Sequence, residues 1–276
     1  WASNHAGRVA FYLKSGQAET SVWKCIDCGT YIQDSDFDDP VIRGHFDVAS
    51  YTSPADVERW RRLRTGLFQY VINLACIHMG RPLTGIRTVD FCIAYGIMLD
   101  LLRDEGAEPE GVETVAELRE SVRGRGFVVH EDVYSLPRHA FDLVTAIDSF
   151  YYINDPARAL TSMRESLTDD GILIMRLANR TPYFNAVLKL GMKIPERRFG
   201  DLKYFYSQDG AQRLLKRTGF EIERVYWTDR GRRDPRFWES IFYRLSPIVN
   251  HISPVKVSPG MIIVARPSVV SRESLA

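Results

Sequence analysis

The sequence predicts an α/β protein in which a doubly wound, mostly parallel sheet follows a small, irregular N-terminal appendage. From Thr88 onward, short apolar segments alternate with amphipathic segments, the pattern of buried strands joined by covering helices. Several of the amphipathic segments end at a glycine, as helices commonly do. The chain has 276 residues and 45% hydrophobic content, which suffices for one large core.

Charge composition narrows the range of partners. Lys and Arg number 36 against 35 Asp and Glu, so there is no electrostatic reason to expect nucleic acid. No apolar run approaches the roughly 20 residues that span a bilayer, and no secretory signal is apparent. Four cysteines in a chain of this length do not indicate a disulfide framework. We expect a cytoplasmic protein with neither a membrane nor a nucleic-acid partner.

The chain divides into an N-terminal segment, a leading helical segment, a sheet domain and a tail: 1–50, 51–85, 86–267 and 268–276. In the leading segment, Ser53 can cap a helix and Pro54 suits its first position. Apolar residues then recur at helical spacing: Val57, Trp60, Leu63, Leu67, Val71 and Leu74. The helix should end near residues 79–82, where Gly and Pro follow.

The sheet domain predicts strands and helices in alternation. The expected strands are Thr88–Phe91, Glu110–Glu113, Phe127–His130, Phe141–Ile147, Gly171–Leu177, Phe220–Trp227 and Met261–Ala265. The expected helices are Ile97–Glu105, Thr114–Val122, Pro156–Leu167 and Ser207–Thr218.

Acidic residues lie at the ends of the first three expected strands. Asp90 belongs to the first strand, Glu113 closes the second, and Asp132 follows the third. Doubly wound sheets bind ligands outside the carboxyl ends of their strands. A carboxylate after the second strand suits two ribose hydroxyls, and one after the third suits an adenine amino group. These positions predict a nucleoside-shaped pocket.

Seven motifs in this order resemble those of class I S-adenosylmethionine-dependent methyltransferases. They are Val89-Asp90-Phe91, Gly111-Val112-Glu113, Glu131 to Pro137, Phe141 to Thr145, Asn154-Asp155-Pro156, Leu167 to Gly171 and Gly260 to Val264. The resemblance runs from about Ile86 to Pro267 and implies a Rossmann-like sheet of seven strands. It also implies S-adenosylmethionine as the cofactor and a small-molecule acceptor as the partner. By position, the implied cofactor-binding residues are Asp90, Phe91, Cys92, Gly96, Glu113, Asp132, Val133 and Ile147.

The loop after the first strand departs from the family pattern. The family usually has Asp-x-Gly-x-Gly-x-Gly, whereas here Cys92 and Ala94 replace the first two glycines and only Gly96 remains. The loop can form without strain if φ stays negative at Cys92 and Ala94. A positive φ there would cost on the order of 1–2 kcal/mol. The alternative is a turn that no longer binds a cofactor.

The segment after the fourth strand lacks an obvious general base. Tyr151 and Tyr152 stand where many family members have a histidine-containing pair. Tyrosine, with a pKa near 10, is a poor base but can align an acceptor hydroxyl. We assign Tyr152 and Asp148 as catalytic candidates, with packing as the alternative for both tyrosines. Methyl transfer can also proceed by positioning alone.

An aromatic and basic segment, about residues 179–206, is expected to cover the acceptor. It suits a flat or anionic acceptor, such as a sugar nucleotide or aryl compound, or it forms an interface. The predicted substrate contacts are Tyr51, Tyr151, Arg176, Asn179 and Phe199. Tyr51 and Arg64 are also candidates for contact with the methionine carboxylate. The alternative is a solvated basic face formed by Arg59, Arg61, Arg62 and Arg64.

The sequence Cys25-x-x-Cys28-Gly29 resembles one knuckle of the zinc ribbon that precedes some sugar and antibiotic methyltransferases. Structural zinc needs four ligands, usually from two knuckles. His5 is a candidate third ligand, and no fourth is visible. The sequence therefore leaves two possibilities, a zinc site at Cys25, Cys28 and His5 or a vestigial ribbon held by packing.

Two functions follow from these patterns. The first is an S-adenosylmethionine-dependent methyltransferase that acts on oxygen or nitrogen of a sugar or secondary metabolite. The second is a methyltransferase-fold protein that has lost or repurposed the activity and serves as a binding or regulatory partner. A homodimer or a heteromeric partner is compatible with both.

Overall fold

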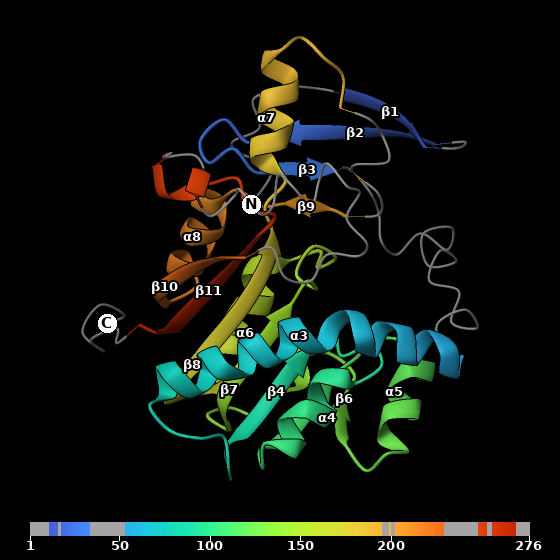
Figure 1. Ribbon diagram of the computed structural model, residues 1–276, viewed down its shortest axis with the longest axis vertical. Helices are drawn as coiled ribbons and strands as arrows, with labels where there is room; N and C mark the ends of the chain where they lie inside the picture. Colours follow the sequence, from blue (N-terminus) through green and yellow to red (C-terminus); the bar gives the residue numbers. More distant parts are fainter. Residues whose placement is uncertain are drawn as a thin grey trace.

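The structure, a computed structural model, describes residues 11–15, 18–33, 53–194, 199, 202–228, 248–252 and 256–268. These residues form two sheets (Figure 1). The larger sheet has seven strands in the order β10-β11-β8-β7-β4-β5-β6, and the smaller has four in the order β1-β2-β3-β9. In the larger sheet only the pairings of β11 are antiparallel. The expected α/β class with a seven-stranded, mostly parallel sheet is confirmed.

The strands of the larger sheet are β4 (Arg87–Phe91), β5 (Glu108–Val112), β6 (Val128–His130), β7 (Phe141–Ile147), β8 (Leu167–Ala178), β10 (Phe220–Thr228) and β11 (Gly260–Pro267). The helices are α3 (Pro54–Met79), α4 (Ile97–Asp104), α5 (Ala116–Arg123), α6 (Pro156–Ser166), α7 (Thr181–Lys189) and α8 (Gln208–Arg217), with a 3-10 turn η2 (Val133–Ser135).

Strand β4 lies at the point where strand order reverses. The chain runs outward from β4 to β5 and β6, then returns to the other side of β4 for β7 and β8. Such a reversal leaves an opening at the carboxyl ends of the two diverging strands, where doubly wound sheets bind ligands. The candidate site is therefore expected at the carboxyl ends of β4 and β7.

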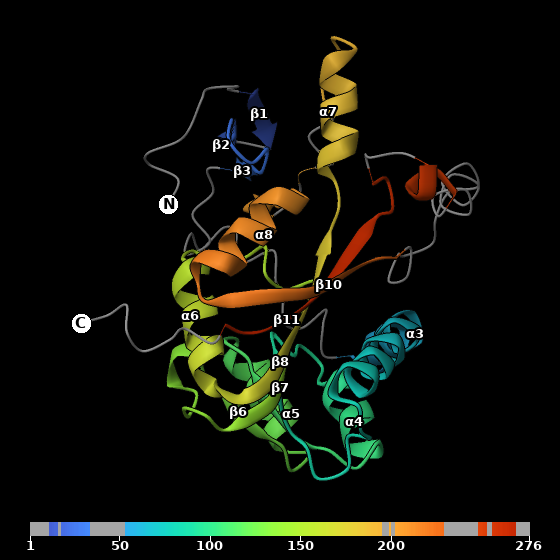
Figure 2. The same ribbon diagram turned by 90° about the vertical axis from the view of Figure 1, so that its left-hand side faces the viewer.

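Helices cover both faces of the sheet (Figure 2). One core packs α3 and α4 against side chains such as Leu143, Ile174 and Ile262. The other packs α6 and α8 against the alternate residues of the same strands, including Val144 and Met175. Because side chains alternate along a strand, this division fixes which strand residues face α3.

The long helix α3 begins and ends where its sequence indicates. The hydroxyl of Ser53 accepts a hydrogen bond from the backbone N–H of Asp56 at 3.2 Å, and Pro54 occupies the first turn. Gly80 closes the helix in a left-handed conformation, φ 67°. Among the described helices, α3 included, none is long and apolar enough to cross a bilayer.

The N-terminal segment differs from the irregular structure that we expected. It forms strands β1 (Phe11–Ser15), β2 (Ala18–Lys24) and β3 (Tyr31–Gln33). Strand β3 pairs antiparallel with β9 (Tyr204–Phe205), which lies inside the expected acceptor-cover segment. A three-residue strand is too short for its period to be recognised, and its partner lies far along the chain. Helix α7 and strand β9 are likewise elements that sequence periodicity missed.

Candidate functional site at the carboxyl edge of the sheet

Asp90 lies on the α3 side of β4 and is almost fully buried. Its carboxylate accepts a hydrogen bond of 2.6 Å from the hydroxyl of Thr145 on neighbouring β7. Burial raises the pKa of Asp90 to about 7, against a smaller opposite effect of this hydrogen bond. Burial thus favours the neutral, protonated form of this carboxyl group.

The loop that follows β4 adopts the backbone of a glycine loop without the glycines. Cys92 has φ 58° and Ala94 has φ 47°, so the condition of negative φ stated above is not met. Gly96 has φ 67° and begins α4. Two non-glycine residues in this region cost on the order of 1–2 kcal/mol each. The surrounding contacts must therefore hold the loop in place.

Glu113, directly after β5, supplies one of those contacts. One carboxylate oxygen accepts the N–H of Ala94 at 3.0 Å, and the other accepts the N–H of Val115 at 3.0 Å. Arg119 donates to the backbone carbonyl of Glu113 at 2.8 Å and so fixes the same turn. Burial raises the pKa of Glu113, partly offset by these N–H bonds. Each oxygen keeps a lone pair for a further donor.

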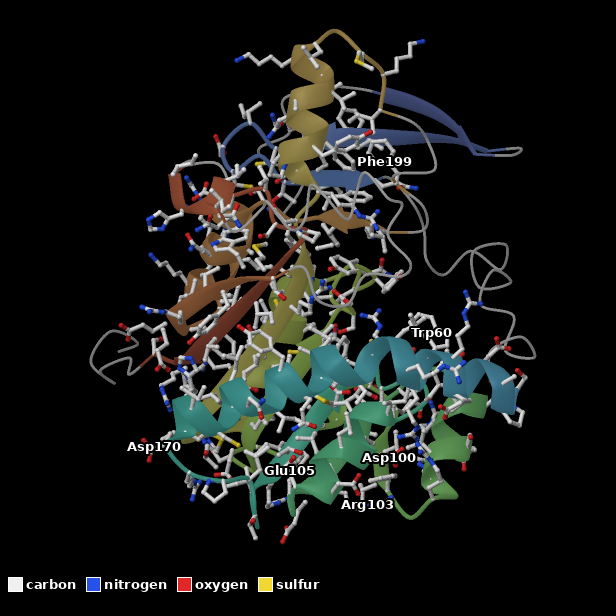
Figure 3. The ribbon with its side chains drawn as sticks, in the orientation of Figure 1. Trp60, Asp100, Arg103, Glu105, Asp170 and Phe199 are labelled. Carbon is white, nitrogen blue, oxygen red and sulfur yellow. The ribbon has the colours of Figure 1, made fainter. Side chains whose placement is uncertain are left out.

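A second set of contacts joins the loop to helix α3. Asp100 of α4 accepts from Arg61 of α3 at 2.7 Å and from Arg125 at 2.8 Å. Arg125 also donates to the carbonyl of Tyr95 at 2.6 Å. A side chain on Gly96 would displace the Arg125 guanidinium, and the φ of 67° would strain any other residue there. Figure 3 shows Trp60 of α3 and Asp100 of α4 near the same end of α3.

Sequence reasoning missed this set of contacts around Asp100. The one available signal was Asp100 itself, a carboxylate in the apolar stretch Ile97-Met98-Leu99-Asp100-Leu101 that opens the helix. The two arginines come from positions 39 residues before and 25 residues after it. Nothing in their local sequence indicates the pairing.

Asp148, directly after β7, forms the most buried ion-pair cluster at this edge. Its carboxylate accepts from Arg64 of α3 at 2.5 Å and from Arg176 of β8. Burial alone would raise the pKa of Asp148, but the two guanidinium groups outweigh it and hold the pKa below its ordinary value. Asp148 adopts φ 57°, in the left-handed region. A carboxylate held this way is a poor proton acceptor.

The arginines of α3 divide between the two roles left open by the sequence. Arg59 and Arg62 are exposed, as a solvated face requires. Arg61 and Arg64 turn toward the sheet edge and form ion pairs with Asp100 and Asp148. The guanidinium of Arg64 also lies 5.3 Å from the ring of Trp60.

The two tyrosines after β7 lie in different surroundings. Tyr151 is buried, and its hydroxyl donates to Asp148 at 3.3 Å and accepts the N–H of Ala178. Burial and the nearby Asp148 carboxylate raise the pKa of Tyr151 far above its ordinary value. Tyr152 is half-buried, with its ring 6.2 Å from that of Tyr151. Their catalytic and substrate-binding assignments stay predictions.

The adenine-side residues lie at the third strand, as their position indicates. Asp132 caps the 3-10 turn η2, and one oxygen accepts the N–H groups of Tyr134 and Ser135 at 2.7 and 2.9 Å. Val133 is buried, and Ile147 at the end of β7 is half-buried. Phe91 is buried at the end of β4. These placements are compatible with the predicted cofactor edge and do not test it.

The expected substrate contacts are not all brought together. Arg176 joins the Asp148 cluster, whereas Asn179 donates to the carbonyls of Lys256 and Ser258 at 2.7 and 3.0 Å. Phe199 is buried beneath α7 (Figure 3), with its ring 4.9 Å from that of Phe184. Tyr51 lies outside the described residues.

Cys25 and Cys28 lie on a tight turn between β2 and β3. The N–H of Cys25 donates to the carbonyl of Thr30 at 2.8 Å, and Gly29 adopts φ 73°. Both thiols are free, and no cluster of metal-binding side chains occurs among the described residues. His5, the predicted third ligand, lies outside those residues.

A reversed strand order with acids near the ends of β4 and β5 is typical of doubly wound nucleotide-binding domains, among which are the S-adenosylmethionine-dependent methyltransferase domains. The chain belongs to this family: the sequence profile described as "Methyltransferase domain" matches residues 59–225. No curated protein sequence matches the chain.

Solved structures show the same fold at low identity. The Haloferax volcanii complex of the Trm112 methyltransferase activator matches with 17% identity and TM-score 0.51, over 76% of this chain and 95% of that one. Magnesium protoporphyrin IX methyltransferase from Synechocystis PCC 6803 with bound SAH matches with 18% identity and TM-score 0.50, over 80% and 98%. A [4+2]-cyclase matches with 21% identity and TM-score 0.51, over 73% and 82%. The cyclase illustrates that the fold alone does not determine the reaction.

Proposed function

We propose that this protein transfers a methyl group from S-adenosylmethionine to oxygen or nitrogen of a small molecule. The observation that supports the proposal most directly is the position of Glu113. Its carboxylate lies at the end of β5, fixed by Ala94 and Val115, and still has lone pairs for ribose hydroxyls. The residues present thus fit the nucleoside part of this cofactor.

Each residue of the edge has a proposed task. Glu113 would accept the ribose hydroxyls, Asp132 and Val133 would border the adenine, and Ile147 would border the sulfur. Bound S-adenosylmethionine supplies an electrophilic methyl group. The loop from Cys92 to Gly96 would lie against its methionine part. Asp90 lies in β4, the strand that leads directly into this loop, and would help to position it.

The electrostatics of the edge favour an acceptor that needs no general base. The pKa of Asp148 is held low by two arginines, and that of Tyr151 is raised by burial. Neither group takes up a proton readily near neutral pH. Tyr152 remains a candidate for aligning the acceptor. We infer that the acceptor atom is already nucleophilic, such as a free amine or an acidic hydroxyl, and that positioning provides the catalysis.

Isothermal titration calorimetry with S-adenosylmethionine and S-adenosylhomocysteine tests the proposal. We expect binding by the wild-type protein and about tenfold to hundredfold weaker binding by Glu113→Gln, the loss of one or two charge-assisted hydrogen bonds. Glu117→Gln, the same change at an exposed position of α5, should bind like wild type.

Absence of heat with both ligands would favour the second function, a binding or regulatory protein with the same fold. The observation behind that alternative is the positive φ at Cys92 and Ala94, where glycine is the natural residue. Recovery of binding in a Cys92→Gly, Ala94→Gly variant would then indicate loss of an ancestral site. The Haloferax volcanii complex makes a heteromeric partner a further proposal for this chain, beside the homodimer.

A further inference from the structure

A pocket lies near the carboxyl edge of the sheet, beyond β8 on the side away from α3. It has a volume of about 370 Å³, near the lower end of ligand pockets. It opens between the first turns of α7 and α8 and the end of β10. The lining residues are Asn179, Thr181, Pro182, Ser207, Gln208, Asp209, Gln212, Trp227 and Lys256.

The charged side chains of this pocket are already engaged within the protein. Asp209 accepts a hydrogen bond of 2.8 Å from Arg213, one helical turn away. The ammonium of Lys256 donates to the carbonyl of Asn250 at 2.5 Å. A charged ligand would therefore compete with an existing partner for its counter-charge. A neutral ligand meets no such competition.

The groups that remain for a ligand are neutral. Gln208 and Gln212 lie one turn apart on α8, and within the described part of the chain their amides have no hydrogen-bond partner. The amide N–H groups of Asn179 donate to the carbonyls of Lys256 and Ser258, so its amide oxygen remains as an acceptor for a ligand. The hydroxyl-bearing Thr181 adjoins Asn179 on the same wall.

Trp227 adds a flat apolar surface. It is the penultimate residue of β10, half-buried, and lines the pocket together with the glutamines of α8 and with Asn179 and Thr181. The same pocket thus offers neutral polar groups and an indole ring. This arrangement suits a ring with hydroxyls around its rim and C–H groups on one face.

The pocket is joined to the Asp148 cluster by a short chain of contacts. Asn179 follows Ala178, whose N–H donates to the hydroxyl of Tyr151. That hydroxyl in turn donates to Asp148 at 3.3 Å. Tyr151 therefore links the wall of the pocket at Asn179 to Asp148 at the end of β7.

We propose that this pocket binds a neutral sugar ring of the acceptor, with the ring against Trp227 and its hydroxyls on Gln208 and Gln212. The assignment of this sugar to the acceptor rests on the proposed function. The binding of the sugar does not, because the pocket lining includes none of the residues proposed to bind the cofactor.

Ligand-observed NMR by saturation transfer tests the pocket directly. The probes are the methyl glycosides of glucose, galactose, mannose and rhamnose, with adenosine as the probe for a nucleobase. We expect transfer to at least one glycoside. Gln208→Ala with Gln212→Ala should weaken that binding about tenfold, the loss of one to two hydrogen bonds. Trp227→Leu should abolish it, and the glutamine variant keeps the test valid if Trp227→Leu fails to fold.

Gln69→Ala is the matched control, since Gln69 lies on α3 and bonds to Glu105. It should leave glycoside binding unchanged. Transfer to none of the glycosides, transfer to adenosine alone, or glycoside binding that survives both pocket variants would overturn the proposal. Calorimetry with S-adenosylmethionine on the same variants separates the two proposals. Sugar binding without cofactor binding would contradict only the proposed methyltransferase activity. Cofactor binding without sugar binding would contradict only the proposed sugar site.

Discussion

Three carboxylates at this edge have the same formal charge and different surroundings. Asp90 is buried beside a hydroxyl, Glu113 beside backbone N–H groups, and Asp148 between two guanidinium groups. Their pKa values shift accordingly, upward for Asp90 and Glu113 and downward for Asp148. Only full cationic partners overcome the desolvation of a buried carboxylate here.

Asp90 should make stability fall as pH rises. Its pKa in the folded state, about 7, exceeds the ordinary value of 3.8. Between pH 4 and pH 7 the folded protein therefore keeps a proton on Asp90 that the unfolded chain has lost. This contribution to stability is present below pH 4 and lost as pH rises through 7. Urea unfolding of Asp90→Asn should show a gain over wild type that grows by a few kcal/mol between pH 5 and 8. A constant difference across that range would contradict the assignment.

At the scale of elements, the loop from Cys92 to Gly96 holds a strained backbone through contacts from outside it. Ala94 donates to Glu113, and Arg125 bonds to the carbonyl of Tyr95. Arg125 shares Asp100 with Arg61, which ties the loop to α3. The helix, the loop and the end of β5 thus stabilise one another.

Ala94→Gly should stabilise the protein by about 1 kcal/mol, because glycine adopts the observed φ of 47° without strain. The matched control is Ala186→Gly in the exposed middle of α7, where the same change should cost roughly 0.5–1 kcal/mol. Urea denaturation of both variants gives the comparison. Equal destabilisation by the two changes would mean that the loop is not strained.

The sequence allowed the strands of the larger sheet to be predicted because their apolar runs are local signals. Val144 and Ile174 lie in such runs, whereas β5 has the sequence Glu-Pro-Glu-Gly-Val and was located by the order of the motifs. The pairing of Arg61 with Asp100 and of β3 with β9 could not be predicted. These contacts join residues that are distant in sequence, and neither partner carries a local pattern that points to the other.

At the scale of the whole molecule, the N-terminal strand β3 and the turn before it pack against α7 and the start of α8. Tyr31 of β3 donates to Asn185 of α7 at 2.8 Å, and its ring lies 5.3 Å from that of Phe184. Ser207, the cap of α8, donates to the carbonyl of Cys28. Packing and hydrogen bonds therefore hold the cysteine turn against α7 and α8.

We predict that this packing, not a metal, holds the turn. Treatment of the full chain with EDTA should leave the melting temperature unchanged, and elemental analysis should find less than one zinc per chain. Cys25→Ser should leave the melting temperature nearly unchanged for the same reason, because serine is close in size to this half-buried, free cysteine. Stoichiometric zinc, lost together with a drop in melting temperature on chelation, would contradict this prediction and reopen the possibility of a zinc site at Cys25, Cys28 and His5.

The pairing of β3 with β9 has a consequence for biosynthesis. Tyr31 of β3 and Phe205 of β9 lie opposite each other in the smaller sheet. Strand β9 is synthesised long after β3, so during translation β3 cannot form this pairing until most of the chain has been made. At ribosomal rates of about 5–20 residues per second, that interval is roughly ten to thirty seconds. During this time β3 exposes an unpaired edge that other nascent chains could join.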